Sequence, residues 1–455
     1  MSDLEMAFDI IKGKRSDLDT LWNYANGPQP LKYSTERLEQ AFDNIYAHFE
    51  LNWCSVIVDA TLDRLNLTGF DTRKSSVDAR LKELFANLHI EIEAYKAHNA
   101  ALATTEAYLI VWKTGDEIEI YYNDPRLCAV IYESARPKVK RDAAKWFVRD
   151  AGLNQITLYY TDRLEHWVSD KAEVDKANSF SLESVGTNPY KTIPVFELTS
   201  PGEFVKVTTM QDAVNKLFAD MMVAAEYGAF VQRYVISNSD PGQLKNGPNM
   251  IWWIPGGDGQ GQQASVGQFT PTDLQTYLKA MDTIASDMAI ISRTPKHYLL
   301  DLGSNISGEA LMTMETPLTK KVKARQREFG AQWQDIAAFM LLLDGLTVPP
   351  ADITVLWERP EAIQVYTEAQ ARQLAVNTGI PLITVLRREG WTDVEIEKMQ
   401  QDQELQDKAR KTVAQAVLND LRIRQEQMNP AGGQPNAFNA QEQATAAAGG
   451  SVNAG

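Results

Sequence analysis

The sequence predicts a mixed α+β protein that is mainly helical. Apolar residues recur at intervals of three and four along most of the 455 residues, which is the spacing of amphipathic helices. Between about residues 105 and 199 they instead form short runs rich in β-branched and aromatic residues, as strands do. A chain of this length with 44% hydrophobic residues can bury more than one core, so we expect two to four domains.

The first hundred residues are expected to be helical. From Phe8 to about Ala103 the apolar residues keep helical spacing, and Gly27–Pro30 interrupts them. The strands that follow are separated by Gly, Asp, Asn and Pro, and we expect them to form an antiparallel sheet inserted between helices. The expected strands are Tyr108–Trp112, Ile118–Tyr122, Leu127–Tyr132, Lys145–Val148, Ile156–Tyr160, His166–Val168 and Ile193–Leu198.

Two helices that enclose a small β-module are expected next, as one projecting unit. The first helix starts near Thr209. The second has Thr270 as its N-cap and Pro271 at its first helical position. The module between them is Arg233–Phe269, with strand candidates Tyr234–Ile236 and Met250–Ile254 and a glycine-rich run at Gly256–Gly261.

A long helix is expected from about Gly308 to Leu343, after a loop at Leu299–Ser307. Pro317 lies inside this helix, where it removes a hydrogen bond and clashes with the preceding turn, so we predict a kink near Thr313–Pro317. The remaining expected elements are a strand at Ile353–Trp357, helices at Thr367–Asn377, Ile380–Glu389 and Thr392–Met428, and a flexible tail at 429–455.

Composition excludes several classes of protein. The net charge of -15 argues against tight nucleic-acid binding, which depends on Lys and Arg replacing phosphate counterions. Two cysteines, Cys54 and Cys128, cannot form a disulfide framework and suit a reducing compartment. No apolar run approaches the roughly 20 residues of a membrane span, and acidic residues within Met1–Lys12 argue against a signal peptide, so we expect a soluble protein without a membrane partner.

The motifs that could form a catalytic or ligand-binding site are better interpreted as turns, caps or core residues. No Gly-Lys-Ser/Thr follows Gly256–Gly261, so we interpret this run as the tip of a β-hairpin instead of a phosphate loop. The five histidines include no pair at the four-residue spacing of a helical zinc site, and we expect no metal or cofactor. The segment Gly303–Gly308 lacks the glycine that a nucleophile elbow needs, and Ser307 is instead expected to cap the long helix.

A carbohydrate-active enzyme remains an alternative. The acidic pairs Glu91 with Glu93 and Glu117 with Glu119 could serve as glycosidase carboxylates, with some of the ten tryptophans as sugar platforms. Because sixty acidic residues produce such pairs by chance, a solvated surface is the favoured interpretation, and the tryptophans fit core patterns.

One basic cluster departs from the acidic total. It places five cations within eight residues, and we leave three explanations open: a solvated helix face, a phosphate contact or an intersubunit salt bridge. The cluster consists of Lys320, Lys321, Lys323, Arg325 and Arg327.

The order of these features resembles the portal proteins of tailed double-stranded DNA bacteriophages, the minor capsid portal family of long-tailed phages. Three stretches carry the resemblance: Ser292–Leu300, then Gly303–Leu311, then Lys320–Gly330 with Trp333. They look like the family's Thr-x-x-Pro, Asn-x-Ser-Gly-x-Ala-Leu and charged long-helix patterns. The run from Asp212 to Ala225 is similar to the family's first stem helix, and the similar region covers about 140 residues.

The resemblance implies a phage portal fold with wing, stem, clip and crown regions around a channel. Carried onto this sequence, the regions are an N-terminal wing at 1–206, a first stem helix at 207–231, the clip at 232–270, a second stem helix at 271–293, a tunnel loop at 294–307, the kinked long helix and a wing return strand at 308–360, crown helices at 361–428 and the flexible tail at 429–455.

The resemblance also implies two functional segments. The DNA-facing tunnel-loop residues would be Leu300, Asp301, Leu302, Gly303, Ser304, Asn305 and Ile306. The clip tip that docks partners would be Gly256, Gly257, Asp258, Gly259 and Gln260. The segment Leu299–Ser307 departs from a strongly basic pattern, because it carries Asp301 and no Lys or Arg.

The implied function is that of a non-enzymatic ring of twelve subunits in the virion, assembled in the host cytoplasm, which conducts DNA during packaging and ejection. The implied partners are the major capsid protein, the large terminase, a head–tail adaptor and, transiently and without sequence preference, double-stranded DNA. ATP hydrolysis would belong to the terminase. Another virion scaffold or adaptor protein is the remaining alternative.

Overall fold

The computed structural model describes residues 2–28, 51–150, 152–229, 233–236, 265–270, 272–300, 307–361, 365–389, 391 and 393–428. It divides into two compact units, Met1–Ala362 and Ile363–Gly455. The prediction of a mainly helical α+β fold is confirmed.

The first unit begins with a capped helix and continues with three more. Ser2 and Glu5 form a capping box that starts α1, because each side chain accepts from the backbone N–H of the other residue. The helices are α1 (Asp3–Asn26), α3 (Trp53–Leu62), α4 (Ser75–Asn87) and α5 (Ile90–Thr104). Helix α5 packs closely against its neighbours, because the buried residues at 97, 100, 101 and 103 are all alanines with small side chains.

The helical prediction for this region was wrong at one place. Residues Leu67–Asp71 form strand β1, which pairs antiparallel with β12 (Thr354–Trp357) near the other end of the unit. Five residues interrupted by Gly69 give no periodic signal, and the partner strand lies far away in sequence. Only the folded chain brings the two together.

The predicted antiparallel sheet is present as two sheets. A three-stranded sheet has the order β3-β2-β9, and a five-stranded sheet has the order β4-β5-β6-β7-β8. Strand β8 was not predicted, because its side chains are mostly exposed and polar. The bounds are β2 (Glu106–Thr114), β3 (Glu117–Asn123), β4 (Cys128–Glu133), β5 (Arg136–Val148), β6 (Asn154–Tyr159), β7 (Arg163–Ser169), β8 (Ser181–Thr187) and β9 (Val195–Thr199).

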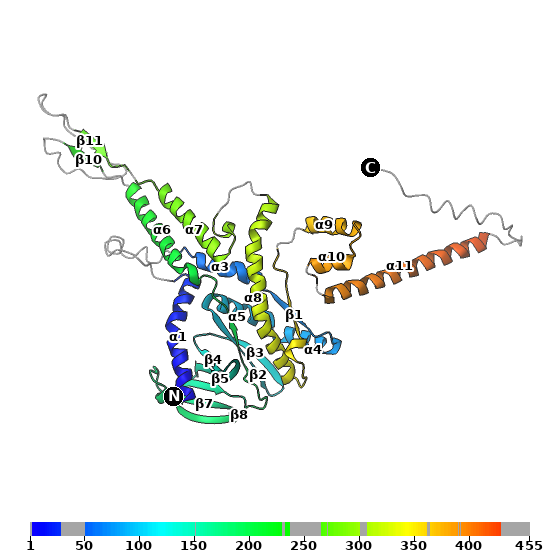
Figure 1. The fold of residues 1–455 in the computed structure, drawn as a ribbon, viewed down its shortest axis with the longest axis horizontal. Helices are drawn as coiled ribbons and strands as arrows, with labels where there is room; N and C mark the ends of the chain where they lie inside the picture. Colours follow the sequence, from blue (N-terminus) through cyan, green and yellow to red (C-terminus); the bar gives the residue numbers. More distant parts are fainter. Residues whose placement is uncertain are drawn as a thin grey trace. The chain divides into compact units, whose positions relative to one another are not determined.

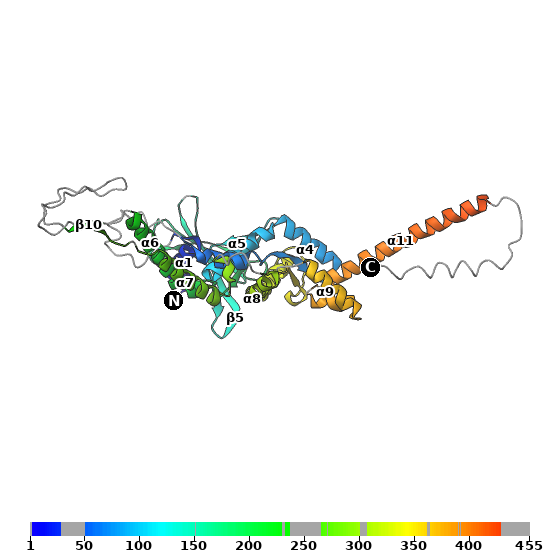
Figure 2. The ribbon, with the colours of Figure 1, turned by 90° about the horizontal axis from the view of Figure 1, so that it is seen from above.

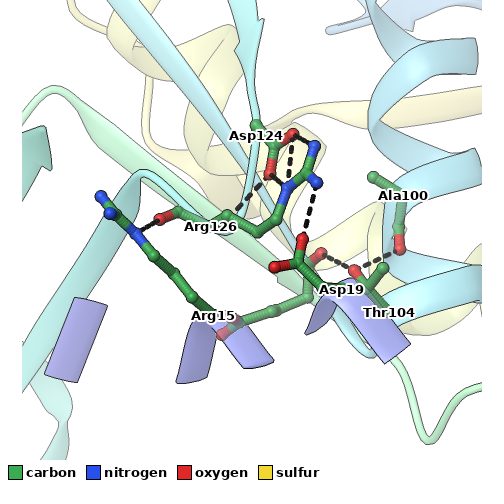
Figure 3. A network of polar contacts seen from close by, with 7 residues as sticks. Arg15, Asp19, Ala100, Thr104, Asp124 and Arg126 are labelled. Atoms are coloured by element: carbon green, nitrogen blue, oxygen red, sulfur yellow. Dashed lines mark hydrogen bonds and ion pairs between the residues drawn. The ribbon is translucent and has the colours of Figure 1, made fainter. Parts of the chain in front are cut away.

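A polar network ties α1 to the turn between β3 and β4. Arg126 donates to Asp124 and, at 2.8 Å, to Asp19 on α1, while the guanidinium of Arg15 donates to the backbone carbonyl of Arg126 at 3.1 Å (Figure 3). The same Arg15 lies 3.9 Å above the ring of Trp146 in the five-stranded sheet. The N-terminal helix is therefore fixed to both sheets.

The main core contains a buried histidine. The indole N–H of Trp333 donates to Nε2 of His98 at 2.9 Å, and the His98 ring stacks on Phe329. Burial lowers the pKa of His98 to about 3, so the ring is neutral and acts as an acceptor. This histidine is therefore a buried core residue.

Two long helices and a hairpin form what we call the paired-helix arm (Figures 1 and 2). It consists of α6 (Thr208–Ala229), β10 (Arg233–Ile236), β11 (Ser265–Gln268) and α7 (Gln275–Ser292). The expected start of the second helix at Thr270 and Pro271 was wrong: α7 begins at Gln275 after Leu274, which makes no side-chain capping bond. Strand β11 was not predicted, and Met250–Ile254 lies outside the described residues.

The long helix α8 (Gly308–Leu343) continues through Pro317, and the predicted kink near Thr313–Pro317 remains a prediction. The predicted cap is confirmed, because Oγ of Ser307 accepts from the backbone N–H of Ala310 at 3.2 Å. The second unit contains α9 (Val365–Asn377), α10 (Leu382–Arg388) and α11 (Asp393–Met428), close to the expected helices. A bidentate pair between Arg372 and Glu389 joins the first two of these helices.

Candidate functional site at the base of the paired-helix arm

Apolar and polar contacts hold the base of the arm. Val214 of α6 and Ala285 and Met288 of α7 are fully buried. Next to them, the hydroxyl of Tyr24 on α1 donates to the carboxylate of Asp212 at 2.8 Å. These contacts pack α6 against the N-terminal helix, so the base of the arm is fixed to the core.

Glu203 is the centre of a buried ion cluster that joins three segments. Its two carboxylate oxygens lie 2.9 Å from Nζ of Lys321 and 2.8 Å from Nε of Arg325, both on α8. Lys321 also donates to the backbone carbonyl of Ser292, the last residue of α7, at 3.0 Å. Burial lowers the pKa of Lys321, and the charge of Glu203 opposes that shift. The segment before α6, the end of α7 and the middle of α8 thus share one cluster, which we call the Glu203 cluster.

A second cluster, the Glu315 cluster, lies where α8 begins. One carboxylate oxygen of Glu315 accepts from Arg64 at 2.7 Å, and the other lies 2.8 Å from Nε2 of His297. Arg64 also donates to the hydroxyl of Tyr298 at 2.9 Å and to the carbonyl of Pro360 at 3.3 Å. Residues just before and just after 301–306 are therefore joined through Arg64.

The residues of these clusters come before and after, in sequence, the segment that the resemblance assigns to the tunnel loop. Leu300 is half-buried and packs on the main core, which fixes one end of that segment. Residues Asp301, Leu302, Gly303, Ser304, Asn305 and Ile306 lie outside the described residues, as do the clip-tip residues Gly256, Gly257, Asp258, Gly259 and Gln260. The assignments of both segments remain predictions.

The basic run divides into two faces of α8. Lys321 and Arg325, four residues apart, point inward to Glu203, which accounts for their charge within the chain. Lys320, Lys323 and Arg327 are exposed and line a groove of about 900 Å³. Within the described residues, Lys323 pairs with Glu361, and neither Lys320 nor Arg327 forms an ion pair.

The groove lies between α8 and strand β12. It is also lined by Gly330 and Ala331 of α8 and by Val355 and Trp357 of β12. Gln334 of α8 donates to the backbone carbonyl of Ile353 at 2.7 Å, which fixes the spacing of the two walls. A lining that combines cations with apolar side chains suits an acidic segment of protein better than a bare phosphate, which needs no apolar contact.

The acidic residues considered as glycosidase carboxylates either join two elements of the fold or lie on an exposed strand face. Glu93 accepts from the backbone N–H of Tyr122 at 2.6 Å and pairs with Lys96, so it joins α5 to β3. Glu117 and Glu119 lie on the exposed face of β3. No group of three or more potential metal-ligating side chains occurs in the part of the chain that the structure describes. A search of the described helices finds none that is both long and apolar enough to cross a bilayer.

Sequence reasoning missed the acidic centres of both clusters. Glu203 follows a strand by a few residues and is 122 positions from Arg325, so nothing local indicates its role. A signal was available in the basic run itself, because helical spacing separates 321 and 325 from 320, 323 and 327. That spacing predicts one buried and one exposed cationic face.

Comparisons with known proteins find similarity over most of the chain. The family model described as phage portal protein, SPP1 Gp6-like, matches residues 32–409. The portal protein of Mycobacterium phage D29 is 24% identical over 411 residues, 81% of this chain and 82% of that protein. The portal protein of Mycobacterium phage L5 is 23% identical over 346 residues, 69% and 70% of the two chains. Among solved structures, the neck of a native GTA particle, computed with C12 symmetry, aligns with a TM-score of 0.43 and 13% identity over 78% of this chain and 92% of that chain.

Proposed function

The chain belongs to the SPP1 Gp6-like phage portal protein family of structural, non-enzymatic virion proteins, and from that premise we propose that twelve copies form a ring at one capsid vertex that conducts double-stranded DNA. The ring is assembled in the host cytoplasm. DNA passes through it into the head during packaging and out of the head during ejection.

The observation that supports this function best is the anchoring of the paired-helix arm. The Glu203 cluster holds Ser292 at the end of α7, and the Glu315 cluster joins His297 to α8, so the chain is held on both sides of residues 301–306. A loop that meets a moving polymer needs rigid supports, because force on the loop must be borne by the body of the protein. The proposed regions are those that the resemblance implies: wing at 1–206, stem at 207–231 and 271–293, clip at 232–270, tunnel loop at 294–307, long helix and return strand at 308–360, and crown at 361–428.

The charge of the chain supports a channel through which DNA moves and argues against tight DNA binding. A chain with net charge -15 and no Lys or Arg among its predicted DNA-facing residues 300–306 repels phosphate, so DNA slides without sticking. The exposed cations Lys320, Lys323 and Arg327 line a groove that also has apolar lining residues, and we assign them to contact with an adjacent subunit.

The clip is the proposed docking region for the large terminase and the head–tail adaptor, and the wing faces the major capsid protein. Replacing Asp258 and Gln260 by alanine should leave rings intact and weaken docking of the terminase or adaptor. Loss of the rings themselves would contradict the assignment of these residues to the clip tip.

Electron microscopy of the purified protein, together with mass photometry, tests the ring. We expect closed rings with an axial hole and a mass of about twelve times the 50.9 kDa chain. A preparation that remains monomeric at micromolar concentration, without closed rings in the images, would overturn the proposal.

A further inference from the structure

A second pocket is formed by the last turns of α8 together with strand β5 and the segment that leads into β9. Its volume is about 440 Å³, within the range of small-molecule binding sites. The turn that follows α8 completes the lining, and all of these segments belong to the first unit. The described residues of this lining differ from those of the groove beside Lys320 and Arg327, and the proposed function does not use them.

The charges of this pocket are unbalanced. Among its described lining residues three are lysines, Lys138, Lys140 and Lys191, and one, Asp335, is acidic. In a chain with a net charge of -15 such a surplus of cations is a local exception. Within the described structure, the ammonium groups of Lys138 and Lys191 have no hydrogen-bond or ion-pair partner, and Lys140 forms no ion pair with Asp335.

The three lysines reach the pocket from two separate segments. Lys138 and Lys140 lie two positions apart on β5, so they share one face of that strand. Lys191 precedes β9 and has a left-handed backbone conformation with φ of 52°, which side chains other than glycine and asparagine adopt at a cost. The fold thus gathers like charges that repel one another, an arrangement that an anion stabilises.

The ammonium group of Lys140 has a fixed position. Its Nζ donates to the backbone carbonyl of Val195 at 2.7 Å and lies 4.2 Å from the centre of the Phe196 ring. This bond uses one of the three N–H groups of the ammonium. Burial lowers the pKa of Lys140 to about 8, and the charges of Asp335 and Glu197 oppose that shift. A carboxylate bound at Nζ would provide the close counter-ion that the described residues do not.

The rest of the lining is mainly apolar. Its apolar residues are Ile193, Phe196, Ala338, Phe339, Leu342 and Val348. Leu342 exposes 37% of its surface and Ala338 is half-buried, so part of the apolar wall is accessible to a ligand. A peptide segment would bring a polar amide with every residue, and the three threonine hydroxyls of the lining satisfy few of them. A single carboxylate on an apolar chain or ring matches this lining better.

We propose that this pocket binds an amphipathic carboxylic acid, with the carboxylate at Nζ of Lys140 and the apolar body against Ala338 and Leu342 of α8. Lys138 and Lys191 add attraction for the same negative charge. A bound acid joins β5, the segment before β9 and the end of α8, so it stabilises the folded chain. This inference goes beyond the proposed function and does not depend on ring formation.

Isothermal titration calorimetry of the full chain with octanoate tests the site at pH 7, where Lys140 is mostly protonated. The control ligands are octanol, which has the same apolar chain without charge, and octylammonium, which has the opposite charge. We expect octanoate to bind about tenfold more tightly than octanol, because only the carboxylate forms a charge-assisted hydrogen bond, and octylammonium not to bind. Equal affinities for octanoate and octanol would overturn the proposal.

Variants locate the binding site. Lys140→Met keeps an apolar stem without the charge and should weaken octanoate binding about tenfold. Lys191→Met, at an exposed position where the fold is not at risk, should weaken it several-fold. The control is Lys145→Met: Lys145 is also half-buried on β5, but it lies 4.9 Å from the ring of Tyr121 and outside the lining.

Thermal unfolding gives a second measurement. Octanoate should raise the unfolding midpoint of the unmodified chain and of Lys145→Met, and should raise that of Lys140→Met much less. Unchanged octanoate affinity in Lys140→Met and Lys191→Met, or an equal loss in Lys145→Met, would contradict the assignment of the carboxylate to this pocket.

Discussion

At the scale of single residues, Glu203 is the charge on which the base of the arm depends. It is nearly inaccessible, and it neutralises two cations that are themselves buried, Lys321 and Arg325. A buried cation without its partner is far more costly than the same cation in water. The cluster is therefore a point where one substitution affects three segments.

We expect Glu203→Gln to lower the free energy of unfolding by about 3–5 kcal/mol, because it leaves two buried cations beside a neutral amide. The control is Glu328→Gln: Glu328 also pairs with Arg325 but is 47% exposed, and the loss there should stay below about 1 kcal/mol. Urea unfolding followed by tryptophan fluorescence measures both. Equal effects of the two variants would show that burial of the cluster contributes nothing.

His98 makes stability depend on pH. Its folded-state pKa of about 3 lies below the usual value of 6.5, so the unfolded chain binds a proton more readily than the folded chain. The stabilisation is complete above pH 6.5 and is lost as the pH falls toward 3, by about 1.4 kcal/mol per unit. In His98→Gln, which keeps an acceptor for Trp333, that dependence should disappear. Unfolding of both proteins at pH 4.5, 5.5 and 7 checks this, and parallel curves would contradict it.

At the scale of elements, the Glu315 cluster fastens the start of α8 to the short segment that follows α7. Arg64, which holds Glu315 and Tyr298, comes from the region between α3 and β1. The first turns of α8 are otherwise exposed, with Leu311 and Met312 each more than a third accessible. Their order therefore depends on this polar contact more than on apolar packing.

The variant Glu315→Gln should loosen the first turns of α8, because a neutral amide holds Arg64 and His297 less strongly than a carboxylate does. Hydrogen exchange in residues 310–318 should accelerate several-fold, while the buried part of α8 around Trp333 stays unchanged. Glu309→Gln in the first turn, which makes no ion pair in the described structure, is the control. Unchanged exchange in Glu315→Gln would show that the cluster does not order the helix.

The sequence predicts elements well where the signal is local and poorly where it is not. Ser307 caps α8 as expected, because a cap depends only on the next three residues. The equally local signal at Thr270 and Pro271 failed, since α7 begins only at Gln275. Strand β1 exists only through its pairing with β12, and Glu203 matters only through residues on α8. Contacts between distant parts of the chain leave no periodic trace that one sequence could reveal.

At the scale of the whole molecule, the charges are unevenly distributed over the surface. The chain carries -15, yet Lys320 and Arg327 face outward from one groove without an ion pair in the described structure. Exposed cations in an acidic protein are natural contacts for the acidic surface of an adjacent copy. The same cations could attract DNA, so the two roles must be distinguished by experiment.

The double variant Lys320→Glu, Arg327→Glu should separate these roles. If the groove holds an adjacent subunit, reversal of its charge replaces attraction by repulsion, and the fraction of chains in rings at micromolar concentration should fall several-fold. The loss should be greatest at low salt, because added salt screens repulsion between exposed charges over about 10 Å at 0.1 M. Binding of a short DNA duplex, measured by fluorescence anisotropy, should change less than about twofold. Lys279→Glu on an exposed turn of α7 is the matched control. Intact rings with strongly weakened DNA binding would instead assign the groove to phosphate. The acidic ring would then repel DNA everywhere except at the level of Lys320 and Arg327.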